Sequence, residues 1–151
     1  MLIRKPTTKD VPEMQALINS FADKGELLPR SLNMLYEDIR DFLIMEDNGQ
    51  IVATCALHIN WNDLAEVKSL TVHPDYQGKG LGKQIVQACL NEAKNLGVSR
   101  VFALTYKPEF FKRLGFKDID KDDLPKKVWS ECINCPKYPD CGEMAVILEM
   151  D

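Results

Sequence analysis

A glycine-rich turn between an apolar run and a long amphipathic run is the feature that most limits how this chain can fold. The turn occupies residues 77–82, Gln-Gly-Lys-Gly-Leu-Gly, and follows the strand-like residues 67–72. Glycine has no Cβ atom, so backbone N–H groups in such a turn can approach an anion at the N-terminus of the next helix. The pattern predicts a strand, an anion-binding loop and a helix, with a pyrophosphate group as the first ligand to suspect.

The residues before this turn predict a short strand at residues 2–4 and then two helices. Thr8 and Asp10 are N-cap candidates for the first helix, which ends at Gly25. Its apolar residues recur at helical spacing, at Met14, Leu17, Ile18 and Phe21. Ser31 is the expected cap of the second helix, whose apolar positions are Leu35, Ile39 and Phe42.

The middle of the chain predicts an antiparallel meander of three strands. Residues 42–45 and 51–57 are apolar runs that flank Asp47-Asn48-Gly49, and Asn-Gly between such runs is a strong hairpin signal. A third run follows at residues 65–72.

The second half predicts one βαβ unit. After the glycine turn a helix is expected to residue 96, with Gly97 as its stop, and residues 101–104 then form a strand parallel to residues 65–72. A short helix at residues 109–114 and a final strand at residues 145–148 complete the pattern. The fold class is therefore α+β, with a mixed, mostly antiparallel sheet and flanking helices.

Length and composition predict one domain over residues 1–151 and exclude some function classes. The net charge of −4 comes with no basic stripe, which argues against a nucleic-acid partner. No apolar run approaches the roughly 20 residues that span a bilayer, so no membrane partner is expected. The N-terminus does not resemble a signal peptide, and the five cysteines are then expected to be reduced thiols in the cytoplasm.

The glycine turn by itself does not identify a ligand. Its spacing is not the G-x-G-x-x-G of dinucleotide-binding folds, and no Gly-Lys-Ser/Thr closes it as in a P-loop. A turn that starts a helix without binding a ligand is the alternative.

The surrounding residues resemble the GCN5-related N-acetyltransferase (GNAT) family. Residues 70–82 are similar to the acetyl-CoA signature of that family, in which Gln77, Gly80 and Gly82 match the fixed positions. Residues 110–116, Phe-Phe-Lys-Arg-Leu-Gly-Phe, resemble its second signature. The resemblance extends from residue 2 to about residue 120, and it implies the GNAT fold.

The resemblance implies an acetyl-CoA site between two diverging strands, with the thioester in a cleft between Leu70 and Leu104. Backbone amides from Gly78 to Lys83 would hold the pyrophosphate, aided by the helix dipole. Lys79 and Lys83 would either touch phosphates or remain solvated. The full set of expected acetyl-CoA contacts is Leu70, Thr71, Val72, Gln77, Gly78, Lys79, Gly80, Leu81, Gly82, Lys83, Phe110 and Phe111.

Within the family, the chain is most similar to the acetyltransferase domain of N-acetylglutamate synthase. That resemblance implies that Arg30 binds a carboxylate of the acceptor and that Glu66 is the general base. Leu28, Ser31 and Ser69 would line the acceptor site. A surface arginine and a Glu66–Lys68 salt bridge are the structural alternatives for the two charged residues.

Strand alternation places Glu66 on the same face as Lys68 and Leu70, beside the thioester. Many family members carry a tyrosine acid where this chain has Phe110 and Phe111, so Tyr106 is the expected acid, with water as the alternative. His58 is a reserve base near the acceptor cleft. His73 is expected to be structural, and Trp61 and Trp129 are candidates for a pocket wall or the core.

A cysteine-containing segment at residues 126–144 lies outside the family pattern. Cys132, Cys135 and Cys141 provide three thiols, one fewer than a tetrahedral metal site needs, so no metal is expected and these cysteines are only weak candidates. The segment is a candidate lid over the acceptor site. Its Lys126, Lys127 or Lys137 would take the place of a second carboxylate-binding arginine, which has no match here.

The expected function is transfer of an acetyl group from acetyl-CoA to the α-amine of a small amino acid, with L-glutamate as acceptor and arginine biosynthesis as the setting. Acetylation of another amine, such as a protein N-terminus, lysine or polyamine, is the alternative within the class. A non-catalytic acyl-CoA-binding regulatory module is the alternative outside it. A homodimer is one assembly open to such a fold.

Overall fold

The computed structural model describes residues 1–124 and 143–150. Within these residues, seven strands form one sheet in the order β1-β2-β3-β4-β5-β7-β6. The strands are β1 (Leu2–Arg4), β2 (Phe42–Asp47), β3 (Gln50–Trp61), β4 (Leu64–Val72), β5 (Arg100–Thr105), β6 (Lys117–Asp118) and β7 (Met144–Glu149). The helices are α1 (Val11–Ala22), α2 (Leu32–Glu37), α3 (Leu81–Asn95) and α4 (Pro108–Lys112), with 3₁₀ turns η1 (Thr8–Asp10), η2 (Ile39–Asp41), η3 (Pro74–Tyr76) and η4 (Lys121–Asp123).

The sheet confirms the predicted α+β class. Strands β1 to β4 pair antiparallel in sequence order, and β4 and β5 pair parallel on either side of the α3 crossover. The hairpin between β2 and β3 turns at Asn48 and Gly49, whose φ angles are 52° and 81°. Two positive φ angles in a two-residue loop match the right-handed twist of the paired strands.

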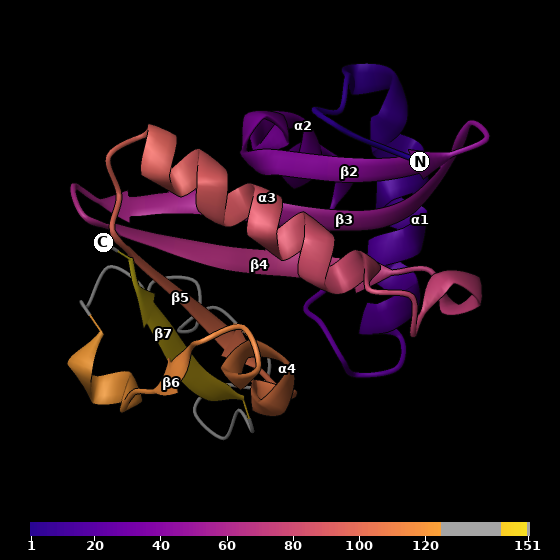
Figure 1. Cartoon of the computed structure of the whole chain (residues 1–151). Helices are drawn as coiled ribbons and strands as arrows, with labels where there is room; N and C mark the ends of the chain where they lie inside the picture. The colour runs from indigo at the N-terminus through magenta and orange to yellow at the C-terminus, as the bar shows by residue number, and fades with distance from the viewer. Residues whose placement is uncertain (125–142, 151) are drawn as a thin grey trace.

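Helices cover both faces of the sheet, as Figure 1 shows. α3 and α4 lie on one face, where residues such as Ile85, Cys89 and Phe111 pack with Val67 and Val101 in one apolar core. α1 lies on the other face, where Met14 and Ile18 belong to a second core. We call these the α3 face and the α1 face.

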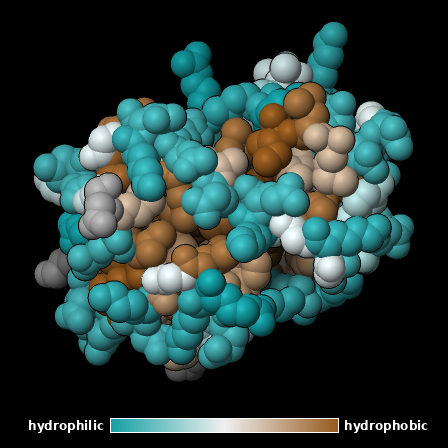
Figure 2. Space-filling view, in the orientation of Figure 1, coloured by the Kyte–Doolittle hydropathy of each residue, from teal (hydrophilic) through white to brown (hydrophobic). Residues whose placement is uncertain are grey.

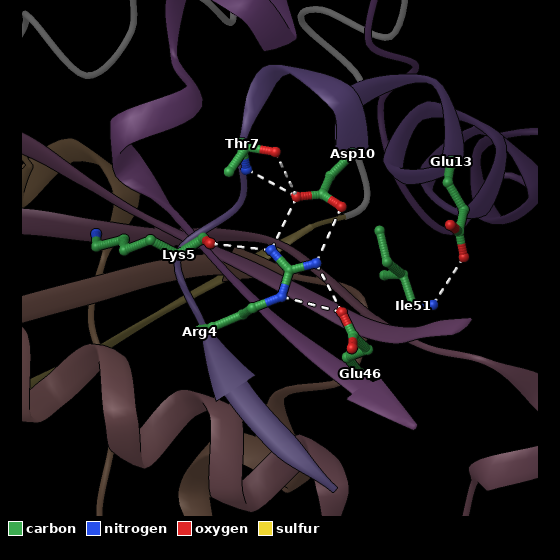
Figure 3. A network of polar contacts seen from close by, with 7 residues as sticks. All are labelled: Arg4, Lys5, Thr7, Asp10, Glu13, Glu46 and Ile51. Atoms are coloured by element: carbon green, nitrogen blue, oxygen red, sulfur yellow. Dashed lines mark hydrogen bonds and ion pairs between the residues drawn. The ribbon is translucent and has the colours of Figure 1, made fainter. Parts of the chain in front are cut away.

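An ion-pair network joins the start of the chain to the sheet (Figure 3). The guanidinium of Arg4 in β1 donates to Asp10 of η1 at 2.9 and 3.0 Å, and to Glu46 of β2 at 2.7 and 3.0 Å. The backbone N–H of Thr7 donates to the same Asp10 carboxylate at 2.7 Å. The network fixes the position from which α1 begins.

β4 and β5 diverge, as the resemblance predicted. They pair at Ala65 with Val101 and at Glu66 with Phe102, near the beginning of both strands. Toward their C-terminal ends the strands separate, and Figure 1 shows β5 running away from β4. Within residues 1–124 and 143–150 the diverging ends of β4 and β5 do not pair with each other, which leaves backbone groups along the gap available to a ligand.

A β-bulge in β4 corrects the predicted side-chain alternation. Lys68 pairs with Ala56 and Thr71 pairs with Thr54, so Ser69 and Leu70 together lie opposite one residue of β3. Ser69 has a φ of 54°, and its carbonyl accepts a hydrogen bond from the Thr54 hydroxyl at 2.8 Å. One extra residue in a strand moves every following side chain to the opposite face of the sheet.

The expectation that Glu66 and Leu70 share a face is therefore wrong. Leu70 packs against the core of the α3 face. Glu66 lies opposite His58, and its strand neighbour Val67 belongs to the α3-face core. Because adjacent residues in a strand point to opposite faces, Glu66 points to the α1 face.

Other differences concern boundaries. The apolar pattern fits Phe42 both to the second helix and to the following strand; in the structure α2 ends at Glu37 and Phe42 begins β2. α4 ends at Lys112 rather than at Leu114, and the two-residue β6 has no signal in the alternation pattern. None of the helices within residues 1–124 and 143–150 is long and apolar enough to cross a membrane.

Candidate functional site

A cavity of about 320 Å³ lies where β4 and β5 diverge. In the space-filling view, apolar side chains gather between α3 and the part of the sheet formed by β5 and β7, and a second apolar group lies on the other side of α3, over β2 (Figure 2). The cavity is lined by Phe21, Glu26, Leu27, Val67, Lys68, Ser69, Leu70, Val72, Gln77, Gly82, Leu104, Thr105, Tyr106, Lys107, Phe110, Phe111, Arg113 and Glu143.

The glycine loop leads from this cavity to the N-terminus of α3. Gly78 and Gly80 have φ angles of 78° and 83°, and a Cβ atom at either would have no heavy atom within 4 Å. Gly80 is the N-cap of the 15-residue α3 and has no side chain to cap the first turn. The N–H groups of that turn are therefore available to an anion, and the geometry fits a pyrophosphate.

Gly82 is a glycine for a different reason. A Cβ atom there would lie 3.2 Å from Cε1 of Phe110 and 3.7 Å from Cγ2 of Val72. Its absence lets the first turn of α3 approach α4 and the end of β4 closely. Phe110 and Phe111 themselves form an edge-to-face pair with ring centroids 5.1 Å apart.

Side chains of the preceding turn hold the loop in place. The amide of Gln77 donates to the carbonyl of Val72 at 3.0 Å. Nδ1 of His73 accepts from the backbone N–H of Asp75 at 3.1 Å, which supports the structural role predicted for His73. The Tyr76 hydroxyl donates to Asp47 at 2.7 Å, a bond that raises the pKa of Tyr76, and Nζ of Lys79 lies 5.3 Å from the Tyr76 ring centroid.

Arg30 is buried, with 8% of its surface exposed. Its backbone N–H donates to Asn19 at 3.0 Å, and its carbonyl accepts from Gln15 and Asn19 at 3.1 and 3.3 Å. Among the described residues, its buried Nε has no hydrogen-bond partner. The α1 amides therefore fix the backbone of a residue whose side chain retains an unsatisfied donor.

The other predicted acceptor residues lie at different depths. Ser69 lines the cavity, whereas Leu28 is only partly buried and its neighbour Leu27 lines the cavity instead. The Ser31 hydroxyl accepts from the N–H of Met34 at 3.1 Å and so caps α2, as predicted. Glu66 is buried, two residues before the cavity-lining Lys68.

The side chains of the predicted cofactor contacts Leu70, Thr71 and Val72 lie on both faces of the sheet. Leu70 and Val72 line the cavity on the α3 side. Thr71 points away from it, and its hydroxyl lies 2.7 Å from that of Thr54. Only its backbone therefore remains for a ligand in the cavity.

His58 and Glu66 are directly opposite in the β3–β4 pairing. Nδ1 of His58 lies 2.9 Å from a carboxylate oxygen of Asp41 in η2. The predicted base and the predicted reserve base are thus neighbours on one face. The sequence offered no signal for this pairing, because it depends on the register between the two strands.

Tyr106 lines the cavity, beside a charged pair that the sequence did not point to. Nζ of Lys107 lies 3.9 Å from Glu26, so residues that follow β5 and α1 meet across the cavity wall. Arg113 of the second signature also lines the cavity. Only the tertiary structure brings these segments together.

Two cysteines lie in the core, and the other three lie outside the described residues. Cys55 and Cys89 are buried free thiols, and the contact with Cys89 together with burial raises the pKa of Cys55. The metal candidates Cys132, Cys135 and Cys141 lie outside the described residues, as do Trp129, Lys126, Lys127 and Lys137. Within residues 1–124 and 143–150, no group of three His, Cys, Asp or Glu is arranged to hold a metal ion.

Comparison with known sequences identifies relatives over nearly the whole chain. Residues 11–116 match the acetyltransferase (GNAT) family. An uncharacterised N-acetyltransferase of Chlorobaculum tepidum is 35% identical over 145 residues, which cover 96% of this chain and 94% of that protein. The amino-acid acetyltransferase of Mycobacterium tuberculosis is 37% identical over 140 residues, covering 91% of this chain and 79% of the relative.

Solved structures share the fold. The Rv2747 protein of Mycobacterium tuberculosis, in complex with CoA and a second ligand, has a TM-score of 0.86 and 31% identity over the full length of both chains. N-acetylglutamate synthase of Neisseria gonorrhoeae, complexed with coenzyme A and N-acetyl-glutamate, has a TM-score of 0.91 and 28% identity. This chain corresponds to 35% of that synthase. The chain therefore belongs to the acetyltransferase (GNAT) family and is an N-acetyltransferase whose acetyl donor is acetyl-CoA.

Proposed function

We propose that this N-acetyltransferase acetylates the α-amine of L-glutamate, the reaction that begins arginine biosynthesis. Two similarities support the proposal. The relative from Mycobacterium tuberculosis is named an amino-acid acetyltransferase, and the similar synthase of Neisseria gonorrhoeae was crystallised with N-acetyl-glutamate.

The observation that carries the proposal is the buried guanidinium of Arg30. Its Nε has no hydrogen-bond partner among the described residues. An unsatisfied buried donor costs about 1 to 3 kcal/mol, and more when it is charged. A carboxylate of the acceptor would satisfy it, since carboxylates match the two-pronged geometry of arginine. Glutamate brings two carboxylates, whereas a polyamine would bring only positive charge.

The acetyl donor is proposed to lie along the seam between β4 and β5. The pyrophosphate would accept hydrogen bonds from N–H groups of the Gly78–Lys83 loop. The pantetheine arm would pair with the backbone of Leu70 and Val72 and contact Phe110. Its thioester would then lie between Leu70 and Leu104, which both line the cavity.

In the proposed reaction, Glu66 removes a proton from the acceptor ammonium. The neutral amine attacks the thioester carbonyl, and the backbone N–H near Leu70 stabilises the oxyanion. Collapse of the tetrahedral intermediate breaks the C–S bond, the amide nitrogen loses its second proton, and that proton reaches the thiolate by way of Tyr106 or water. A positioned general base contributes roughly 10²- to 10⁴-fold in rate.

A thiol-release assay with acetyl-CoA and the common amino acids tests the proposal. We expect turnover with glutamate, and a glutamate KM raised by about 10- to 100-fold in Arg30→Ala because a charge-assisted hydrogen bond is lost. The KM for acetyl-CoA should not change. Arg100→Lys is the matched control, since Arg100 is an exposed arginine paired with Asp63 away from the cavity.

Turnover with lysine or a polyamine instead of glutamate would favour the other acceptors. Binding of coenzyme A without turnover on any amine would favour a regulatory module. The proposed setting is the cytoplasm, where free thiols such as Cys55 and Cys89 stay reduced. A homodimer is the proposed assembly, which light scattering would measure.

A further inference from the structure

We infer that His58, held by Asp41, carries the proton of the acceptor amine from Glu66 to solvent. This inference rests on the proposed function and deepens it. It assigns a role to two residues outside the cavity lining. They act through Glu66 and do not touch the reacting atoms, so they are positioning and relay residues.

The stoichiometry of the reaction requires an exit for a proton. An acceptor that arrives as an ammonium and leaves as an amide loses two protons. The coenzyme A thiolate takes one of them, and the other must reach solvent in every turnover. If Glu66 receives the first proton, it has to release it before the next cycle.

Glu66 is poorly placed to release that proton directly. Only 8% of its surface is exposed. The residue directly opposite on β3 is His58. Directly opposed residues have Cβ atoms about 4.5 to 5.5 Å apart and point to the same face of the sheet, so the two side chains are neighbours.

Asp41 sets the tautomer of His58. A carboxylate oxygen lies 2.9 Å from Nδ1. Because a carboxylate can only accept, Nδ1 carries the hydrogen and Nε2 is the basic nitrogen of the neutral ring. The side chain of His58 is 38% exposed, so the ring lies beside Glu66 and also contacts bulk water.

The charged groups around His58 favour a transient imidazolium. Asp41 faces the ring from η2, and Glu66 and Lys68 lie on the same face of β4. The buried residues of α1 on this face are apolar. The Asp41 carboxylate, at hydrogen-bond distance from Nδ1, stabilises the protonated ring.

The transfer balances without any other reactant. Protonated Glu66 gives its proton to Nε2 of His58, which restores the carboxylate and leaves an imidazolium. The imidazolium then releases one proton to water and returns to the neutral ring. Only protons move in these steps, and one proton reaches solvent for each amide formed.

Steady-state kinetics of His58→Gln test the relay. We expect kcat to fall about 10- to 100-fold, less than the roughly 10²- to 10⁴-fold of the base itself because water can still accept the proton, with the KM for acetyl-CoA unchanged. The acidic limb of the wild-type pH profile should change shape, because the relay requires a neutral His58. In His58→Ala, added imidazole should restore part of kcat, which a purely structural residue would not allow.

Asp41→Asn should lower kcat less, because the ring stays in place while its tautomer is no longer fixed. Asp38→Asn is the matched control beside the same 3₁₀ turn, and it should retain kcat. An unchanged kcat in His58→Gln, or a loss that imidazole does not restore in a variant that still binds coenzyme A, would overturn the relay.

A second measurement does not depend on the acceptor. The chain has two histidines, His58 and His73, so each ring can be followed by NMR titration. Glu66→Gln should lower the pKa of His58, and the His73 ring serves as the internal reference. Absence of any change at His58 would overturn the relay. Absence of glutamate turnover in wild type would instead overturn the proposed function.

Discussion

Asp10 joins three segments of the chain through one carboxylate. It accepts two hydrogen bonds from Arg4 and one from the backbone N–H of Thr7, while the same arginine also binds Glu46 (Figure 3). The Arg4 bonds are the main cause that lowers the pKa of Asp10 from 3.8 to about 2, and they raise the pKa of Arg4. Asp10 directly precedes α1, so its negative charge also interacts favourably with the N-terminal end of the helix dipole.

The lowered pKa predicts a pH-dependent cost for Asp10→Asn. A carboxylate whose pKa is lower in the folded state contributes its full stability above about pH 4 and loses it as the pH falls through about 2. At pH 7 we expect a loss of about 1 to 2 kcal/mol in the free energy of unfolding, after discounting for partial exposure.

Urea denaturation at pH 7 and near pH 2.5 would measure this difference. The gap between wild type and Asp10→Asn should shrink at the lower pH, because wild type begins to protonate the same group. Asp118→Asn is the control: its partner Lys112 is 3.0 Å away, but its side chain is 58% exposed, so little change is expected. Equal losses at both pH values would contradict the assignment.

At the scale of elements, α3 is bounded by two glycines of similar conformation. Gly80 begins it with a φ of 83°, and Gly97 follows its end with a φ of 82°. Neither would meet a heavy atom within 4 Å if it carried a Cβ. Gly97 lies in a helix-ending motif, in which Val98 N–H donates to Ala93 O at 2.9 Å. The two differ in that only Gly80 belongs to the proposed phosphate loop.

This symmetry gives a matched pair of variants. Gly80→Ala and Gly97→Ala should each lose about 1 to 2 kcal/mol of stability, because an L-residue is strained at positive φ. Only Gly80→Ala should also weaken coenzyme A binding, by about 5- to 30-fold if the distorted loop loses roughly 1 to 2 kcal/mol of binding free energy. Isothermal titration calorimetry measures the affinity. Equal affinities in the two variants would exclude the loop as the pyrophosphate site.

At the scale of the whole molecule, the cavity lies where separate parts of the sheet meet. On the α1 face, α1 packs with β2 and β3, whereas Leu64 of β4 packs with Phe102 and Ile147 of β5 and β7. The core of the α3 face joins the strands on both sides of the gap, but β4 and β5 pair only near their beginnings. A ligand that fills the gap between the diverging ends would therefore add contacts to both strands.

Coenzyme A is accordingly expected to stabilise the whole fold. At 100 times its Kd, a ligand that binds only the folded state contributes about 2.7 kcal/mol. For a chain of this size, this corresponds to a rise of roughly 5 to 10 °C in Tm. Differential scanning calorimetry measures the shift. Pantetheine, which lacks the pyrophosphate, is the control and should give a much smaller rise at the same concentration; no shift with millimolar coenzyme A would contradict the site.

The features set by short-range patterns followed from the sequence alone. The Asn48-Gly49 hairpin and the glycine loop before α3 each depend on residues close together in the chain. So does the Ser31 cap of α2. Local backbone preference and apolar periodicity determine such elements, because their hydrogen bonds and turns close within a few residues.

Tertiary structure alone decided which side chains meet. The single extra residue at the Ser69 bulge moved Leu70 to the face opposite Glu66, and strand register placed His58 beside Glu66. The burial of Arg30 and the approach of Glu26 to Lys107 depend on where α1 packs. Side-chain facing alternates with every residue, so one insertion in a ladder reverses it, and contacts between distant segments arise only when the sheet and helices are assembled.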